Sequence, residues 1–188
     1  MNDTYTGTSS RLHRLGKTGT IPTNSIAFAI GQTALGEVLV ARGAMGVCAI
    51  LIGSDAEELR RDLAARFPAD NLVADRSLLR DDLSKAARFI EDPEAGLDLL
   101  LDMGGTPFQR RVWNVLRTIP AGATVTYAEV ARRIGEPRSF RAVARACASN
   151  PIALAVPCHR VVGSNGALSG YRWGIERKRA LIDREAAA

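Results

Sequence analysis

The stretch TYAEVARRIGEPRSFRAVARACA, residues 126–148, predicts two short helices joined by a tight turn. Thr126 is placed to cap a first helix over 127–134, which a glycine then ends. Pro137 opens a second helix that reaches the end of the stretch. Two helices in this arrangement, the second one rich in arginine, are typical of a helix-turn-helix.

The second of these helices has the side chains of a DNA-backbone binder. Arg138, Arg141 and Arg145 fall at i, i+3 and i+7, which places them on one face. The residues between them are small: Ala142, Val143, Ala144 and Ala146. Such a face lets the helix approach a duplex closely but has few groups that read base edges. If the chain acts on a base that it extrudes from a duplex, Arg141 near the start of this helix is placed to fill the gap in the stack; a phosphate contact is the alternative.

The two halves of the chain differ in charge. Residues 1–103 carry 11 Lys and Arg against 15 Asp and Glu, whereas residues 104–188 carry 14 against 5. A basic half attached to an acidic half predicts that only the second half binds a polyanion. An ordinary basic surface is the alternative interpretation.

Composition and periodicity divide the chain into three segments. Residues 1–23 are rich in Thr, Ser and Gly and predict a flexible tail. Residues 24–103 predict a small α/β scaffold domain with strands over 25–30, 36–41, 46–52 and 97–101 and helices over 55–66 and 77–90. Gly104-Gly105 marks the start of a mainly α domain, 104–188, with a winged-helix-like helix-turn-helix and a first helix from Thr106 to Arg117.

Several classes of protein are disfavoured. The chain has no apolar run long enough to cross a bilayer and no secretory signal pattern. Three cysteines and two histidines lack the spacing of a disulfide framework or a zinc site, and Cys48 and Cys147 fit core positions. We therefore expect a cytoplasmic protein without metal or cofactor.

The run PCHRVV, residues 157–162, carries the chemistry. Pro157 restricts the backbone, and the apolar residues before it predict a buried turn. The Cys158 thiol becomes a strong nucleophile when an imidazole takes its proton, and His159 is adjacent. Because neighbouring side chains of an extended chain point apart, a bridging water is expected between them. A third polar group should then orient His159.

This run resembles the acceptor-cysteine signature of the O6-alkylguanine-DNA alkyltransferase family. The resemblance extends from Thr106 to Glu185, which is similar to the family's DNA-binding domain, and from about Ser25 to Asp102, which is similar to its amino-terminal domain. The segment ALSGYRWG, residues 167–174, most resembles the carboxyl-terminal module of the Ada-type members. The resemblance implies a monomer that flips O6-alkylguanine out of double-stranded DNA and moves the alkyl group irreversibly to Cys158, without a cofactor.

The resemblance also implies roles for individual residues. Glu185 would hydrogen-bond His159 and thereby favour the thiolate of Cys158, unless it is merely a solvated residue near the chain end. Tyr127 would rotate the target base and supply a proton or hydrogen bond to the guanine oxygen, unless it is a core residue. Asn150 would brace the turn before the cysteine.

The loop over residues 164–171 resembles the lid of the base pocket. The Val161 carbonyl would read the guanine edge, and Tyr171 would form one wall. Arg172 and Trp173 stand where some relatives have small residues, so we expect a preference for methyl over benzyl groups. The remaining expected contacts with DNA are Thr126, Arg138, Arg145, Asn150 and Ser164.

Three rival functions stay open. A DNA-binding sensor of alkyl lesions without chemistry would need no acceptor, and the combination of Cys158, His159 and Glu185 disfavours it. A cysteine hydrolase would leave the basic helix unexplained. A transcription activator of the Ada type would need a cysteine-coordinated zinc domain, for which the sequence has no cysteine set.

Overall fold

A four-stranded sheet forms the amino-terminal part of the molecule. The computed structural model describes residues 21–187, so the predicted tail lies outside the described residues up to residue 20. The strands are β1 (Ser25–Thr33), β2 (Gly36–Gly43), β3 (Gly46–Gly53) and β4 (Asn71–Ala74). Their spatial order is β3-β2-β1-β4, with β4 parallel to β1 and the other pairs antiparallel. Every residue of β3 is buried, so this edge of the sheet is covered on both faces.

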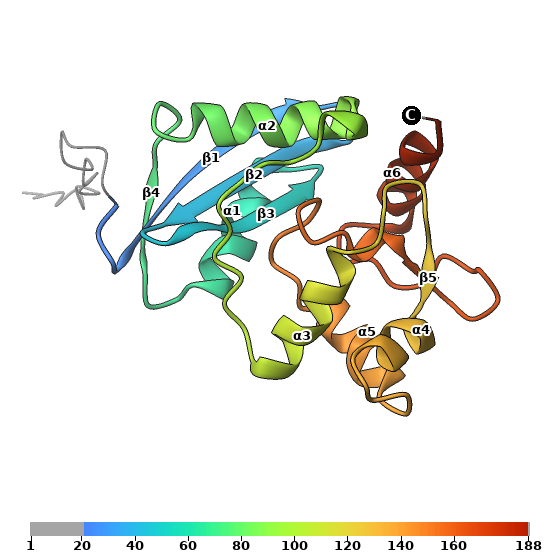
Figure 1. Cartoon of the computed structure of the whole chain (residues 1–188). Helices are drawn as coiled ribbons and strands as arrows, with labels where there is room; N and C mark the ends of the chain where they lie inside the picture. Colours follow the sequence, from blue (N-terminus) through green and yellow to red (C-terminus); the bar gives the residue numbers. More distant parts are fainter. Residues whose placement is uncertain (1–20, 188) are drawn as a thin grey trace, which may run out of the picture.

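Two helices cover the sheet. Helix α1 (Ala56–Arg66) begins at Asp55, whose side chain accepts a hydrogen bond from the Glu58 amide at 2.7 Å, as the sequence predicts. Helix α2 (Arg80–Glu91) buries Leu83, Ala86, Phe89 and Ile90 on one face and is followed by the short turn η1 (Pro93–Ala95). Figure 1 shows α2 along one side of the sheet and α1 on the other.

Two local predictions in this part were wrong, and one strand was missed. The segment 97–101 is not a strand, because only Leu101 forms a bridge to Val47 of β3. The sequence analysis missed β4, whose four residues are too few to show a period. Helix α2 starts at Arg80 instead of residue 77, because Asp75 holds the preceding residues in a turn by accepting hydrogen bonds from the Ser77 hydroxyl and the Leu78 amide.

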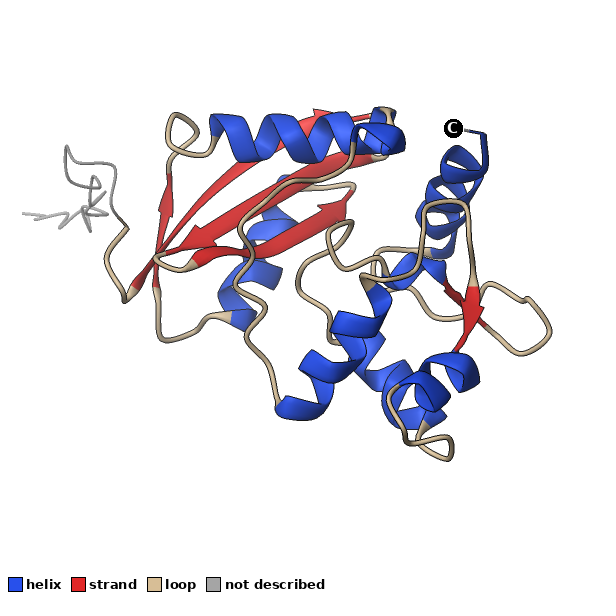
Figure 2. Cartoon of the chain, viewed as in Figure 1, coloured by secondary structure: helices blue, strands red, loops and turns tan. Residues whose placement is uncertain are grey.

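The carboxyl-terminal part is mainly helical (Figure 2). Its helices are α3 (Pro107–Leu116), α4 (Tyr127–Arg133), α5 (Phe140–Ala148) and α6 (Ile175–Ala187). Two-residue strands β5 (Val125–Thr126) and β6 (Val161–Val162) pair in parallel, and the short turn η2 (Cys158–Arg160) precedes β6. This arrangement confirms the predicted α/β part followed by a helical part with a helix-turn-helix, whereas the domain boundary at Gly104-Gly105 stays a prediction.

Capping residues set the starts of α3 and α4. Thr106 and Gln109 form a reciprocal capping box, and the Thr126 hydroxyl accepts from the Glu129 amide at 3.1 Å. Trp113 of α3 is buried and donates from its indole nitrogen to the Ala146 carbonyl at 2.9 Å, which fixes α3 against α5. Trp113 is therefore a packing residue.

Helix α5 is shorter than predicted. It begins at Phe140, because residues 136–139 form a turn in which the Ser139 amide donates to the Glu136 carbonyl at 2.9 Å. Arg138 consequently precedes the helix and does not share its face with the other arginines. Val143 and Ala146 are buried and face the core, so the predicted strip of small residues between the arginines is reduced to Ala142 and Ala144.

The two parts meet at β3. The Ile50 amide donates to the Pro151 carbonyl at 2.9 Å, and the Ala153 amide donates to the Ile50 carbonyl at 2.9 Å. The chain that leads to Cys158 is thus hydrogen-bonded to the edge of the amino-terminal sheet. Every helix between residues 21 and 187 is too short or too polar to span a bilayer.

Candidate active site

A strained loop leads to the acceptor turn. Leu154 is the one non-glycine residue among the described residues with a left-handed backbone, φ +67°, although its side chain is buried. The two hydrogen bonds that Ile50 makes with residues 151 and 153 hold the loop to β3 immediately before this strain. Pro157 then starts the single 3-10 turn that carries Cys158, His159 and Arg160, all three buried.

Asn150 braces this turn as predicted. Its side-chain amide donates to the Val156 carbonyl at 2.8 Å and to Cys158 Sγ at 3.3 Å. Its side-chain oxygen accepts from the Ile152 amide at 2.9 Å. A fully buried amide with these partners fixes the sulfur atom and the loop together. Asn150 therefore lies inside the protein beside the sulfur atom, whereas the sequence analysis grouped it with the DNA-contacting residues.

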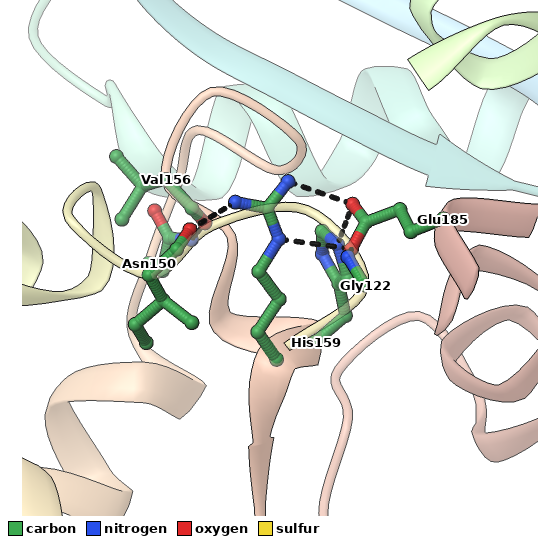
Figure 3. A network of polar contacts seen from close by, with 7 residues as sticks. Gly122, Asn150, Val156, His159 and Glu185 are labelled. Carbon is green, nitrogen blue, oxygen red and sulfur yellow. Dashed lines mark hydrogen bonds and ion pairs between the residues drawn. The ribbon is translucent and has the colours of Figure 1, made fainter. Parts of the chain in front are cut away.

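His159 and Glu185 meet in a buried network that Figure 3 shows from close by. His159 Nε2 lies 2.8 Å from Glu185 Oε1. Arg160 donates to both oxygens of the same carboxylate, from Nε at 2.9 Å and from Nη2 at 2.8 Å, and its third nitrogen donates to the Ile119 carbonyl. The Gly122 amide completes the shell at 3.4 Å. The alternative of a solvated Glu185 is thereby excluded.

The charges of this network assign the proton on His159. Burial alone would raise the pKa of Glu185, but the hydrogen bonds from His159 and Arg160 outweigh it and lower the pKa to about 2. An ionised carboxylate only accepts hydrogen bonds, so Nε2 of His159 carries the proton and Nδ1 keeps its lone pair. Burial lowers the pKa of His159 despite Glu185, which keeps the ring neutral. Nδ1 is buried without a partner among the described residues, so it is free to accept a proton.

Cys158 is a neutral thiol in this structure. Burial raises its pKa to about 11, although the hydrogen bond from Asn150 and the charge of Lys178 act in the opposite direction. Glu185 does not produce a thiolate in this resting state, because the buried imidazole is itself neutral. Its expected effect on the thiolate requires the imidazolium and stays a prediction. The thiol proton must therefore leave during the reaction.

A surface cavity of about 420 Å³ lies next to Tyr171, although none of Cys158, His159 and Arg160 lines it. It is lined by α5 and by the loop before α6, with Tyr127 on one side and Tyr171 and Arg172 on the other. Tyr127 is half-buried, its hydroxyl donates to the Ser169 carbonyl at 3.1 Å, and burial raises its pKa to about 12. The Tyr171 ring stands edge-on to His159, with centroids 6.5 Å apart, and so links the cavity to the network. This is the cavity in which we expect the target base.

Two residues expected at the pocket, Trp173 and Val161, do not line this cavity. Trp173 packs edge-on behind Tyr171, with centroids 5.1 Å apart, and lines a separate cavity against α1. The Val161 carbonyl already accepts from Lys178 Nζ at 2.5 Å. Trp173 therefore acts on the predicted pocket through Tyr171, and the Val161 oxygen has one remaining lone pair for a base.

Lys178 is the functional residue that the sequence analysis missed. Its side chain is fully buried, and its ammonium group donates to the carbonyls of Val161 and Ser169. Lys178 therefore joins the acceptor strand β6 to the loop that covers the cavity. A signal was available, since Lys178, Leu181 and Glu185 are spaced i, i+3 and i+7 on α6 and form its buried face.

The three arginines of the helix-turn-helix are exposed, which a contact with DNA requires. Arg138, Arg141 and Arg145 all reach solvent, and the Arg141 guanidinium lies over the ring of Phe140, 5.5 Å from its centroid. Phe140 is itself 45% exposed. Ser164 is exposed in the loop after β6, whereas Thr126 is occupied as the cap of α4. Among the described residues, no three potential ligands are grouped to hold a metal ion.

A comparison of this sequence with known protein families and proteins identifies similar chains. Residues 107–187 match the family model described as 6-O-methylguanine DNA methyltransferase, DNA binding domain. The chain is 45% identical over 163 residues to the bifunctional transcriptional activator/DNA repair enzyme Ada of Escherichia coli K12, covering 86% of this chain but 46% of that protein. It is 40% identical over 132 residues to the inducible methylated-DNA–protein-cysteine methyltransferase of Bacillus subtilis 168, covering 70% and 74%. The chain thus spans about half the length of its Ada relative.

Solved structures resemble the whole fold. The Mycobacterium tuberculosis OGT in complex with DNA superposes with a TM-score of 0.69 at 34% identity, over 86% of this chain and 93% of that one. The O6-methylguanine-DNA methyltransferase of Pyrococcus kodakaraensis KOD1 superposes with a TM-score of 0.65 at 26% identity, over 85% and 98%. The similarity therefore covers both the sheet and the helical part.

Proposed function

The chain belongs to the 6-O-methylguanine DNA methyltransferase family, and on that premise we propose that it repairs DNA by transferring the alkyl group of O6-alkylguanine to Cys158. One observation carries the proposal. The buried carboxylate of Glu185 leaves Nδ1 of His159 as a free proton acceptor one residue from a buried thiol. This arrangement serves a cysteine nucleophile.

The reaction starts with removal of the thiol proton. Neutral His159 accepts the Cys158 proton at Nδ1 through a water, and Glu185 stabilises the imidazolium that forms. The sulfur atom attacks the O6-alkyl carbon, so that a carbon–sulfur bond forms as the carbon–oxygen bond breaks. The electron pair goes to the guanine oxygen, and a proton or hydrogen bond from the Tyr127 hydroxyl stabilises it. Since the resulting thioether is not hydrolysed, each molecule acts once.

The basic helical part supplies the DNA contacts. Exposed Arg138, Arg141 and Arg145 bind phosphates or enter the duplex, and the loop with Ser164 lies on the same part of the chain. Arg141 occupies the gap left by the flipped guanine, which enters the cavity beside Tyr127. The relative from Mycobacterium tuberculosis was solved in complex with DNA, which supports duplex DNA as the partner. We further propose a cytoplasmic monomer.

Intact-protein mass spectrometry tests the transfer directly. After incubation with a duplex containing one O6-methylguanine, the protein should gain about 14 Da, one methyl group in place of a proton, on Cys158. The gain should stop at one per molecule, and Cys158→Ser should show none. Tight binding to the lesion without a change in mass would instead identify a non-catalytic sensor.

A further inference from the structure

The wall of the base pocket is tied to the amino-terminal part by an ion pair. Arg172, which follows the pocket residue Tyr171, forms an ion pair with Asp62 of α1. It donates to one carboxylate oxygen from Nε at 3.3 Å and to the other from Nη2. A bidentate arginine–carboxylate pair fixes both distance and orientation. A residue of α1, far away in the sequence, thus determines where the segment 171–173 lies.

This segment separates two cavities. On one side is the cavity of about 420 Å³ beside Tyr127, and on the other is a cavity of about 650 Å³ against α1. Arg172 lines both, whereas Asp62 and Trp173 line only the second. Both partners of the ion pair line the second cavity, so the pair, here called the strut, joins the segment 171–173 to α1 at the edge of that cavity. Without the strut the wall has open space into which it can retreat.

A second arginine, Arg66, also lies against the Asp62 carboxylate, so loss of the Asp62 charge would affect two arginines. Arg66 Nε lies 3.3 Å from the same carboxylate, and Arg66 Nη1 donates to the Ser149 carbonyl at 3.5 Å, one residue before Asn150. Burial lowers the pKa of Arg66, and the charge of Arg172 lowers it further, whereas Asp62 acts in the opposite direction. Removal of the Asp62 charge would leave two arginines close together without a counter-ion, and Arg172 would move toward solvent.

We propose that Asp62 is a positioning residue that sets the alkyl-size selectivity of the base pocket through its ion pair with Arg172. When the ion pair holds the segment 171–173 in place, this wall of the pocket excludes larger alkyl groups sterically. A wall released into the second cavity accepts them more readily. This inference rests on the proposed alkyl transfer and assigns to the amino-terminal part a role in specificity in addition to its role as scaffold.

The test is a comparison of single-turnover rate constants on two duplexes, one with O6-methylguanine and one with O6-ethylguanine. In Asp62→Asn the methyl-to-ethyl rate ratio should fall by about 5-fold or more, since one methylene in a fixed pocket is worth at least that much. A duplex with O6-benzylguanine extends the series to a larger group. A mere loss of stability would lower all the rates without changing their ratio.

Glu58→Gln is the matched control, because Glu58 lies on the same helix and lines the same cavity but forms no hydrogen bond or ion pair with Arg172 in the described part of the chain. It should leave the ratio unchanged. Asp62→Asn and Arg172→Gln should each shift the ratio, and the double variant should shift it no further. An unchanged ratio in folded Asp62→Asn, or an equal change in Glu58→Gln, overturns the inference. Absence of any transfer by the unmodified protein would overturn the proposed function instead.

Discussion

At the scale of single residues, Glu185 is the group on which the proposed chemistry depends most. In Glu185→Gln the neutral amide cannot stabilise the His159 imidazolium, so the transfer rate should fall about 100-fold or more. Removal of one partner of a buried ion pair also leaves Arg160 without a counter-charge, at a cost of about 3–5 kcal/mol. Single-turnover kinetics and urea unfolding measure the two effects. Glu176→Gln, an exposed site on the same helix, should change neither, and a fully active Glu185→Gln would contradict the role.

The same network predicts how stability depends on pH. The pKa of Glu185 is lowered from 4.5 to about 2 on folding, so its contribution is present above pH 4.5 and is lost as the pH falls toward 2. The pKa of His159 is also lowered, from 6.5, so the unfolded chain takes up a proton first and stability starts to fall near pH 6.5. Urea unfolding between pH 8 and pH 3 should show this decline. A free energy of unfolding that is constant over this range would contradict the buried neutral histidine.

At the scale of elements, two arginines near the start of α5 can be tested for different roles: filling the gap left by the flipped base, or contacting a phosphate. If Arg141 fills the gap in the duplex, Arg141→Ala should slow transfer from duplex O6-methylguanine by about 10-fold or more. The reason is that no side chain then replaces the flipped base in the stack, so the unstacking energy is not offset. Transfer from the free base O6-methylguanine should stay unchanged. Arg138→Ala, in the turn before the helix, should instead remove about one phosphate contact. The slope of the logarithm of the DNA-binding constant against the logarithm of the salt concentration should then become shallower by about 0.9. Identical behaviour of the two variants would show that Arg141 is only a phosphate contact.

The β2–β3 hairpin allows a test of how the linker, the segment 97–105 between the two parts, packs against the sheet. Gly46 has φ +144°, and a Cβ atom there would lie 2.6 Å from the Leu100 carbonyl oxygen, so Gly46→Ala should destabilise the protein by about 1–3 kcal/mol. Gly43, on the other side of the same turn, has a common backbone conformation and open space around its Cα. Gly43→Ala is therefore the control and should change stability by less than about 0.5 kcal/mol. Equal unfolding midpoints for the two variants would show that the linker does not lie against Gly46.

At the scale of the whole molecule, local patterns were predictable and long-range partners were not. The caps at Asp55, Thr106 and Thr126 depend on neighbouring residues, and the structure has all three. The family resemblance is likewise confirmed. By contrast, the hydrogen bonds of Ile50 to the acceptor loop, and the ion pair of Asp62 with Arg172, join residues about 100 positions apart. No periodicity in the sequence encodes such pairings, because they depend on how the two parts are packed.

That packing predicts a consequence of the reaction for the fold. Cys158 is 5% exposed and its sulfur atom accepts from Asn150, so a methyl group on Sγ must displace close-packed neighbours and weaken this hydrogen bond. Overpacking of this kind costs about 1–3 kcal/mol. The strain should reach the sheet, because the acceptor loop is hydrogen-bonded to Ile50 of β3. The thermal midpoint should therefore fall after reaction with O6-methylguanine DNA and removal of the DNA. Cys158→Ser treated in the same way should not shift, and a methylated protein as stable as the unreacted one would show that the turn accommodates the group.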